Sequence, residues 1–123
     1  MYKPVVYIAS PYSKGDPAMN THFQCGIFDK LLSDGLVLPV APLWSHFQHT
    51  LFPRLYQNWI EYDLAMLSHY DACLRLDAVI ESLGYRESRS TGADSEAERF
   101  IQLGKPVFHD IESLYGWVRS LND

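Results

Sequence analysis

The stretch Val5-Val6-Tyr7-Ile8-Ala9 is a continuous apolar run of strand length, and residues 10–15, which are rich in turn-forming side chains, follow it. Such a run is typical of a strand that is buried on both faces of a sheet. Asp16-Pro17 then predicts a helix start, with an N-cap followed by proline at the first helical position. Apolar residues recur at every fourth position from Met19 to Leu31, and Gly35 predicts the end of this helix.

The rest of the chain repeats this alternation of strand-like and helix-like patterns. The predicted strands cover residues 5–9, 36–40, 72–76 and 107–108. The further helices follow the stripe Leu55, Trp59, Tyr62 and Met66, the face Ala93, Ala97, Phe100 and Ile101, and residues 111–121. Residues 41–53 are predicted as a loop, and residues 78–90 as a polar connection whose length suggests a function. The order βαβαβαβα favours parallel strands joined by right-handed crossovers. We therefore predict an α/β fold of one domain over residues 1–123: a three-layer α/β/α sandwich with a flavodoxin- or Rossmann-like parallel sheet, strand order 2-1-3-4.

Length and charge exclude several classes of protein. The chain has 123 residues, 47% of them hydrophobic, with 10 Lys and Arg against 15 Asp and Glu, for a net charge of −5. This length supports one hydrophobic core. The acidic excess argues against a nucleic acid polymer or an anionic membrane as partner, since both attract clustered positive charge. Cys25 and Cys73 each lie in an apolar stretch, and no apolar run reaches the ~20 residues of a membrane span. We expect a soluble, cytoplasmic protein without a signal peptide.

In a parallel sheet, ligands bind beyond the carboxyl ends of the strands. The segment Ser90-Thr91-Gly92-Ala93-Asp94-Ser95-Glu96 leads from that edge into the third helix, and Glu96 lies about one turn into it. Small polar residues at a helix start present backbone N–H groups to an anion or a sugar hydroxyl. A carboxylate placed there could attack an anomeric carbon or stabilise an oxocarbenium ion. Alternatively, Asp94, Glu96 and Glu98 are ordinary acids of a first turn, with Ser95 and Glu98 forming a capping box.

Several short motifs occur in an order that points to a known family. They are Val6-Tyr7-Ile8-Ala9-Ser10-Pro11-Tyr12, Trp59-x-x-x-Asp63, Asp71, Ser90-x-Gly92-x-x-x-Glu96 and Gly104-Lys105-Pro106-Val107. Together they cover nearly the whole chain, which resembles the nucleoside 2-deoxyribosyltransferase-like superfamily. The chain looks closest to a small bacterial branch of that superfamily whose function is uncharacterised.

The resemblance implies that Glu96 is the nucleophile that takes a sugar from a purine or pyrimidine base. It implies that Tyr7 and Tyr12 line the nucleoside pocket, and that the pocket is completed by another copy in a homo-oligomer. Tyr12 could stack on a base or pack against its own loop. Ser10 and Ser90, with Gly92, could hold a sugar or phosphate, or could serve as caps and turn residues.

A departing base needs a proton, so a second carboxyl group is expected near the nucleophile. Asp77 directly follows the third predicted strand, and Asp63 matches a substrate-contact position of the superfamily; Asp71 has the place of a structural cap. Arg86 or Arg89 could hold a 5′-phosphate with two hydrogen bonds, or could belong to a solvated loop. The spacing His46-x-x-His49 lacks a third ligand at a characteristic distance, so we expect no metal and no other cofactor.

No serine-hydrolase elbow, phosphate-binding P-loop or dinucleotide fingerprint occurs in the sequence. We therefore expect an N-glycosidic enzyme: a nucleoside or 5′-nucleotide (deoxy)ribosyltransferase or hydrolase, with Glu96 attacking C1′. The alternatives are a non-catalytic nucleotide-binding or sensing module on the same fold, and a purely structural protein. The expected partners are a small nucleoside or nucleotide and further copies of the chain, since Trp44, Phe47 and Phe52 suggest a contact surface.

Overall fold

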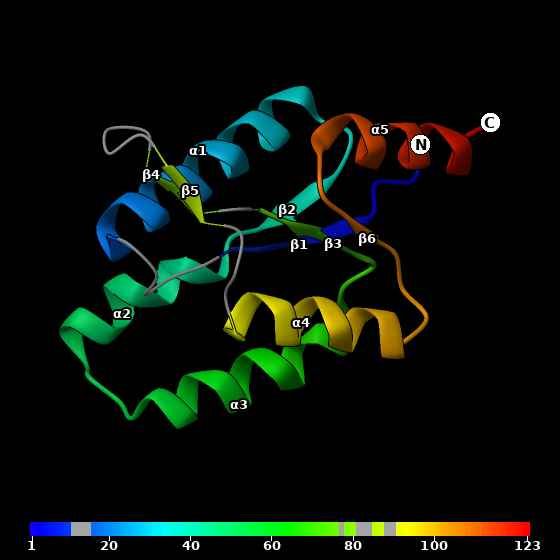
Figure 1. Cartoon of the computed structure of the whole chain (residues 1–123). Helices are drawn as coiled ribbons and strands as arrows, with labels where there is room; N and C mark the ends of the chain where they lie inside the picture. Colours follow the sequence, from blue (N-terminus) through cyan, green and yellow to red (C-terminus); the bar gives the residue numbers. More distant parts are fainter. Residues whose placement is uncertain (11–15, 77, 81–84, 88–90) are drawn as a thin grey trace.

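The computed structural model describes residues 1–10, 16–76, 78–80, 85–87 and 91–123, and Figure 1 shows their arrangement. In chain order the elements are β1 (Val5–Ala9), α1 (Pro17–Asp34), β2 (Leu38–Val40), η1 (Pro42–Trp44), α2 (Ser45–Leu51), α3 (Tyr56–Met66), η2 (Leu67–His69), β3 (Ala72–Arg75), β4 (Ala78–Ile80), β5 (Tyr85–Glu87), α4 (Thr91–Gln102), β6 (Val107–Phe108) and α5 (Ile111–Leu121). Within the described residues, no helix combines the length and the apolar character that a membrane crossing requires.

The main sheet is parallel and has the order β2-β1-β3-β6, so the predicted order 2-1-3-4 is confirmed, with β6 as the fourth strand. β1 pairs with β2 on one side and with β3 on the other, and in the second pairing Tyr7 lies opposite Cys73 and Ala9 opposite Arg75. Helices α1 and α5 cover one face of this sheet and α4 covers the other (Figure 1). The predicted three-layer α/β/α arrangement is therefore also confirmed.

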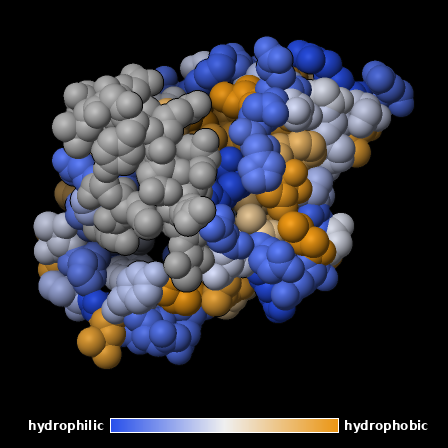
Figure 2. All heavy atoms as spheres, in the orientation of Figure 1, coloured by the Kyte–Doolittle hydropathy of each residue, from blue (hydrophilic) through white to orange (hydrophobic). Residues whose placement is uncertain are grey.

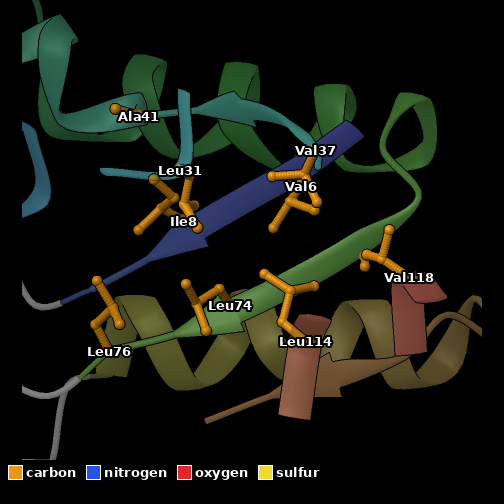
Figure 3. Packing of buried hydrophobic residues seen from close by; sticks show 10 residues of the cluster. Val6, Ile8, Leu31, Val37, Ala41, Leu74, Leu76, Leu114 and Val118 are labelled. Carbon is orange, nitrogen blue, oxygen red and sulfur yellow. The ribbon is translucent and has the colours of Figure 1, made fainter. Parts of the chain in front are cut away.

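The core has two halves because successive residues of a strand point to opposite faces. Val6 and Ile8 of β1 lie with Leu31 of α1 and Leu114 of α5 in the cluster of Figure 3. The intervening Tyr7 and Ala9 lie in the other cluster, with Leu67, Cys73, Ala93 and Phe100. Burial on both faces explains why residues 5–9 are apolar throughout.

The predicted ends of α1 are confirmed by the backbone and its caps. The carboxylate of Asp16 accepts a hydrogen bond from the backbone N–H of Ala18 at 2.9 Å, and Pro17 is the first helical residue. Gly35 follows the helix with φ 71°, a left-handed conformation that glycine adopts without steric cost.

Two connecting segments contain more regular structure than the sequence predicts. Residues 41–53 are not a loop, since they contain η1 and α2; Pro42 begins η1, where a proline costs no hydrogen bond, and Pro53 lies beyond α2. Within residues 78–90, β4 and β5 pair in antiparallel fashion, with Val79 opposite Arg86. The β-branched and aromatic residues of these short strands favour extended backbone, but each run is too short to stand out in the sequence.

The predicted apolar stripe on α3 is only partly correct. Trp59 and Met66 are half-buried, whereas Leu55 and Tyr62 are exposed. Helix α3 lies beside α4 rather than on the sheet (Figure 1), so only a narrow face of α3 is covered. Met19 on α1 and Ile101 on α4, which the sequence also placed on inward faces, are exposed as well.

A buried glutamine joins three segments of the chain. The Gln24 side-chain amide on α1 donates to the Ile8 carbonyl at 2.9 Å and to the Ser10 hydroxyl at 2.8 Å. Its carbonyl oxygen accepts from the backbone N–H of Leu43 at 2.9 Å. Gln24 therefore fixes the end of β1 and the segment that follows β2 to the same helix.

We expect Gln24→Leu, which keeps the volume but removes these bonds, to lower the free energy of unfolding by roughly 2–4 kcal/mol, because buried partners are left unpaired. The matched variant Gln102→Leu changes an exposed residue of α4 and should alter stability by less than about 0.5 kcal/mol. Urea unfolding followed by circular dichroism measures both. Equal stability of the two variants would show that the Gln24 contacts are unimportant.

Candidate active site

A tyrosine of the central strand and a glutamate of α4 meet at the core of the candidate site. The Tyr7 side chain is almost fully buried, and its hydroxyl donates a hydrogen bond to Oε2 of Glu96. The Tyr7 ring stacks on Tyr70 with ring centroids 5.2 Å apart, and Phe100 packs against it at 5.9 Å. Because packing holds the ring, the hydroxyl holds the Glu96 carboxylate in a defined place.

A cavity of about 240 Å³ lies between α3 and α4. Its lining consists of Tyr56, Gln57, Ile60, Asp63 and Leu64 from α3 and of Ser95 and Glu96 from α4. Two carboxyl groups, one amide and one aliphatic hydroxyl thus face a wall that is otherwise aliphatic and aromatic. Pockets for small organic ligands typically have this composition, with few polar groups on an apolar wall.

The two carboxyl groups differ in acidity because they are desolvated to different degrees. Burial raises the pKa of Glu96 to about 8 and that of Asp63 to about 6. The hydrogen bond from Tyr7 favours the ionised form of Glu96, but burial outweighs it. Between pH 6 and 8 the two groups therefore hold about one proton between them, and most of it is on Glu96. Two acids whose environments separate their pKa values are typical of acid–base sites.

The structure brings three of the predicted site residues together: Glu96 and Asp63 line the cavity, and Tyr7 bonds to Glu96. Ser10 is buried, and its hydroxyl accepts the hydrogen bond of Gln24. Gly92 is the second residue of α4. The other predicted residues, Asp77, Tyr12, Ser90 and Arg89, lie outside the described residues, as does the side chain of Arg86 in β5.

The acidic residues near the start of α4 do not all serve as solvent-exposed charges that compensate the helix dipole. Helix α4 begins at Thr91, so Ser95 is inside the helix, where it lines the cavity and cannot form the capping box with Glu98. Asp94 and Glu98 are exposed, although Asp94 also pairs with Arg75. These two acids have the solvated position that the alternative interpretation requires, whereas Glu96 lines the cavity.

One charged residue of this region, Arg75, the last residue of β3, was not predicted from the sequence. Its side chain is only 5% exposed. Nε and Nη2 donate to Oδ1 of Asp94 at 3.2 and 3.0 Å, and Nη1 donates to the carbonyl of Leu76. The available signal was an arginine inside the apolar run Ala72-Cys73-Leu74-Arg75-Leu76, because a buried cation needs a partner.

Two of the motif residues have structural roles. The ammonium group of Lys105 donates to the carbonyls of Ser68 at 2.7 Å and Tyr70 at 2.5 Å, which fixes the end of η2. The carboxylate of Asp71 accepts from the backbone N–H of Val5 at 2.8 Å. These contacts hold the beginning of β1 and the segment before β3, and thereby Tyr7 and Tyr70, in place.

One histidine of the α2 region, His49, has a structural role. Nδ1 of His49 accepts hydrogen bonds from Nε1 of Trp59 at 3.0 Å and from the backbone N–H of Arg54 at 3.1 Å, which joins α2 to α3. In the part of the chain that the structure describes, no three His, Cys, Asp or Glu side chains come together as a metal site would require.

The raised pKa of Glu96 makes stability depend on pH. A carboxyl group whose pKa is about 8 when folded and about 4.3 when unfolded binds more protons in the folded state between these values. Stability therefore falls as the pH rises through this window. We expect the wild type to lose roughly 5 kcal/mol of stability between pH 5 and pH 9 in urea unfolding, about 4 from Glu96 and about 1 from Asp63, whose raised pKa acts in the same direction. Glu96→Gln should keep only the smaller fall that Asp63 causes. Glu98→Gln, two residues away and exposed, is the control and should behave as the wild type; identical pH dependence of all three proteins would contradict the burial of Glu96.

Comparison with protein-family models, with curated proteins and with solved structures found no match to this chain. The resemblance to the nucleoside 2-deoxyribosyltransferase-like superfamily therefore stays a prediction.

Proposed function

We propose that the chain is an N-glycosidic enzyme, which breaks the bond between C1′ of a sugar and the base of a nucleoside or 5′-nucleotide by transfer or hydrolysis. The observation that supports this most directly is the pair Glu96 and Asp63 on one cavity, with Tyr7 holding Glu96. Most enzymes that cleave glycosidic bonds use two carboxyl groups that face the same small space. The resemblance of the sequence motifs points to the same chemistry.

In the proposed reaction, Oε1 of Glu96 attacks C1′, because Oε2 is occupied by the Tyr7 hydroxyl. The C1′–N bond breaks, its electron pair leaves with the base, and Asp63 gives the base a proton. The resulting glycosyl ester is opened when water or a second base attacks C1′, which restores the Glu96 carboxylate. If water attacks, its proton goes to Asp63; a second base delivers its own proton there.

The reactive form needs Glu96 ionised and Asp63 protonated. Their pKa values in the free protein, about 8 and about 6, favour the opposite distribution of the shared proton. The reactive arrangement is therefore ~1% of the one-proton form, a cost of about 3 kcal/mol that contacts with the substrate must offset. Because both arrangements carry one proton, the rate should follow the population of the one-proton form.

The raised pKa of Glu96 also favours a second function. Near pH 7 most Glu96 side chains are protonated, and a neutral carboxyl group inside a cavity is a good hydrogen-bond donor to a ligand. Under this alternative, the chain is a nucleotide-binding or sensing module that holds its ligand without breaking it.

We expect incubation with a panel of deoxynucleosides, ribonucleosides and 5′-nucleotides to release free base, as detected by liquid chromatography. The dependence of kcat/KM on pH should be bell-shaped with its maximum near pH 7. Asp63→Asn should remove the alkaline fall, so that the residual rate rises with pH through about 8 and then levels. Glu96→Gln should reduce kcat/KM by ~100-fold or more, and the exposed control Glu98→Gln should not change it.

The outcomes separate the two candidate functions. Binding of a nucleotide in calorimetry without base release, and without loss of affinity in Glu96→Gln, favours the binding module. If Asp63→Asn is inactive and Glu96→Gln keeps a substantial rate, the roles of the two acids are exchanged. A panel that shows neither binding nor cleavage refutes both proposals.

We further propose that copies of the chain associate through the segment from Trp44 to Tyr56, because it exposes an unusual amount of apolar surface. Phe47, Leu51, Phe52, Leu55 and Tyr56 are 56–76% exposed. In Figure 2, single apolar residues lie between hydrophilic ones along the lower edge of the view, where α3 lies. Exposed apolar side chains that are close together in one segment are typical of interaction sites in soluble proteins. Tyr56 also lines the cavity, so a second copy seated on this surface would border the site.

We expect light scattering to give a dimer or larger assembly for the wild type. The double variant Phe47→Glu, Phe52→Glu should be monomeric, because charges would be buried in the contact. Ile101→Glu, at an equally exposed position on α4, is the matched control and should keep the assembly. A monomeric wild type would contradict this proposal and leave the chemistry of the site unaffected.

A further inference from the structure

The pairing of Arg75 with Asp94 joins the end of β3 to the beginning of α4. The guanidinium is buried, whereas the Asp94 side chain is 62% exposed. Removing a guanidinium from water is costly unless its donors are satisfied. In Arg75, Nε and Nη2 meet Asp94, and Nη1 meets the Leu76 carbonyl at the end of the same strand. The arginine is thus fixed to its own strand and binds the helix from there.

A second contact fixes the same part of α4 to the neighbouring strand. Glu96, two residues after Asp94, accepts the hydrogen bond of Tyr7 on β1. With 3.6 residues in each turn, side chains two positions apart point about 200° apart. Ala93 and Phe100 are buried against the sheet, so Asp94 and Glu96 lie on opposite sides of the inward face of α4.

We propose that Arg75 is a positioning residue, which fixes the rotation of the first turns of α4 and so keeps the Glu96 carboxylate at the cavity. Two contacts on opposite sides of a helix, made from two neighbouring strands, resist rotation about its axis, which one contact alone does not. The inward residue in these turns, Ala93, is too small to resist such a rotation, and Phe100 is almost two turns away. The inference bears on the proposed function, but it concerns a placement that can be measured without a substrate.

Without Arg75, the start of α4 should rotate and Glu96 should leave Tyr7 for solvent. The titration of Glu96 reports this movement, because its acidity depends on burial. Among the described residues, the ionisable groups around Glu96 are Tyr7 from β1 and, on the cavity, Asp63 and Tyr56 from α3. None of them is changed by a substitution at Arg75.

The experiment is a titration of the full chain labelled with ¹³C at the glutamate carboxyl carbons and followed by NMR. The signal of Glu96 is identified by its absence in Glu96→Gln, and in the wild type its midpoint should lie near 8. In Arg75→Met the midpoint should fall by about one pH unit or more. Loss of the Arg75 charge would by itself raise the midpoint of Glu96, and the negative charge of Asp94, left without this cation, would raise it further. A fall of the midpoint can therefore come only from displacement of Glu96 towards water.

Arg75→Lys provides a second decisive measurement, because it retains the charge but loses the two-point contact with Asp94. Its midpoint should also fall, by less than that of Arg75→Met. The matched control Lys30→Met removes the cation of the surface pair Lys30–Asp34 and should leave the midpoint unchanged. An unchanged or raised midpoint in folded Arg75→Met, or an unchanged midpoint in Arg75→Lys where Arg75→Met does not fold, overturns the proposal. Neither result depends on whether the protein cleaves nucleosides.

Discussion

The hydrogen bond from Tyr7 to Glu96 connects the centre of the sheet to helix α4 and to the cavity that Glu96 lines. Tyr7 lies on β1, which is buried on both faces, and a buried tyrosine hydroxyl needs a hydrogen-bond partner. Glu96 is that partner, so the core and the site share one polar contact. Movement of α4 along or around its axis breaks this contact and leaves a buried hydroxyl unpaired. The requirement that Tyr7 be satisfied therefore orders the site.

The two acids differ because the fold holds them at different depths. Glu96 lies on α4, which packs directly on the sheet, whereas Asp63 lies on α3, which packs beside α4 and is mostly exposed. The deeper group is the more desolvated one, and it has the higher pKa. Because α4 packs on the sheet and α3 packs beside α4, the same cavity contains a weaker acid, Glu96, and a stronger acid, Asp63. The destabilisation that ionised Glu96 causes is the cost of this arrangement.

The parts of this fold that could be predicted from the sequence are those with local signals. The apolar run at residues 5–9, the cap at Asp16 and the glycine at Gly35 each depend on a few neighbouring residues, and the structure has them as expected. The approach of Asp63 and Glu96 depends instead on how two helices pack, which only the motif order suggested. Arg75 was missed because its partner is 19 residues away, and no pattern in either segment indicates the pairing. Helix α2 was missed because residues 41–53, which contain it, include two prolines and two histidines, a composition typical of loops.

The charges around the cavity restrict which part of a ligand it accepts. Among the described residues that line it, Asp63 and Glu96 are the only ones with a carboxyl group, and no lysine or arginine is present. Arg75 is not among these lining residues, and its guanidinium donates to Asp94 and to the Leu76 carbonyl. A phosphate placed in the cavity would be repelled by ionised Asp63, whereas a sugar hydroxyl or a neutral base can bond to either acid. The cavity is therefore suited to an uncharged group, and under the proposed function the phosphate of a 5′-nucleotide would have to be bound outside it.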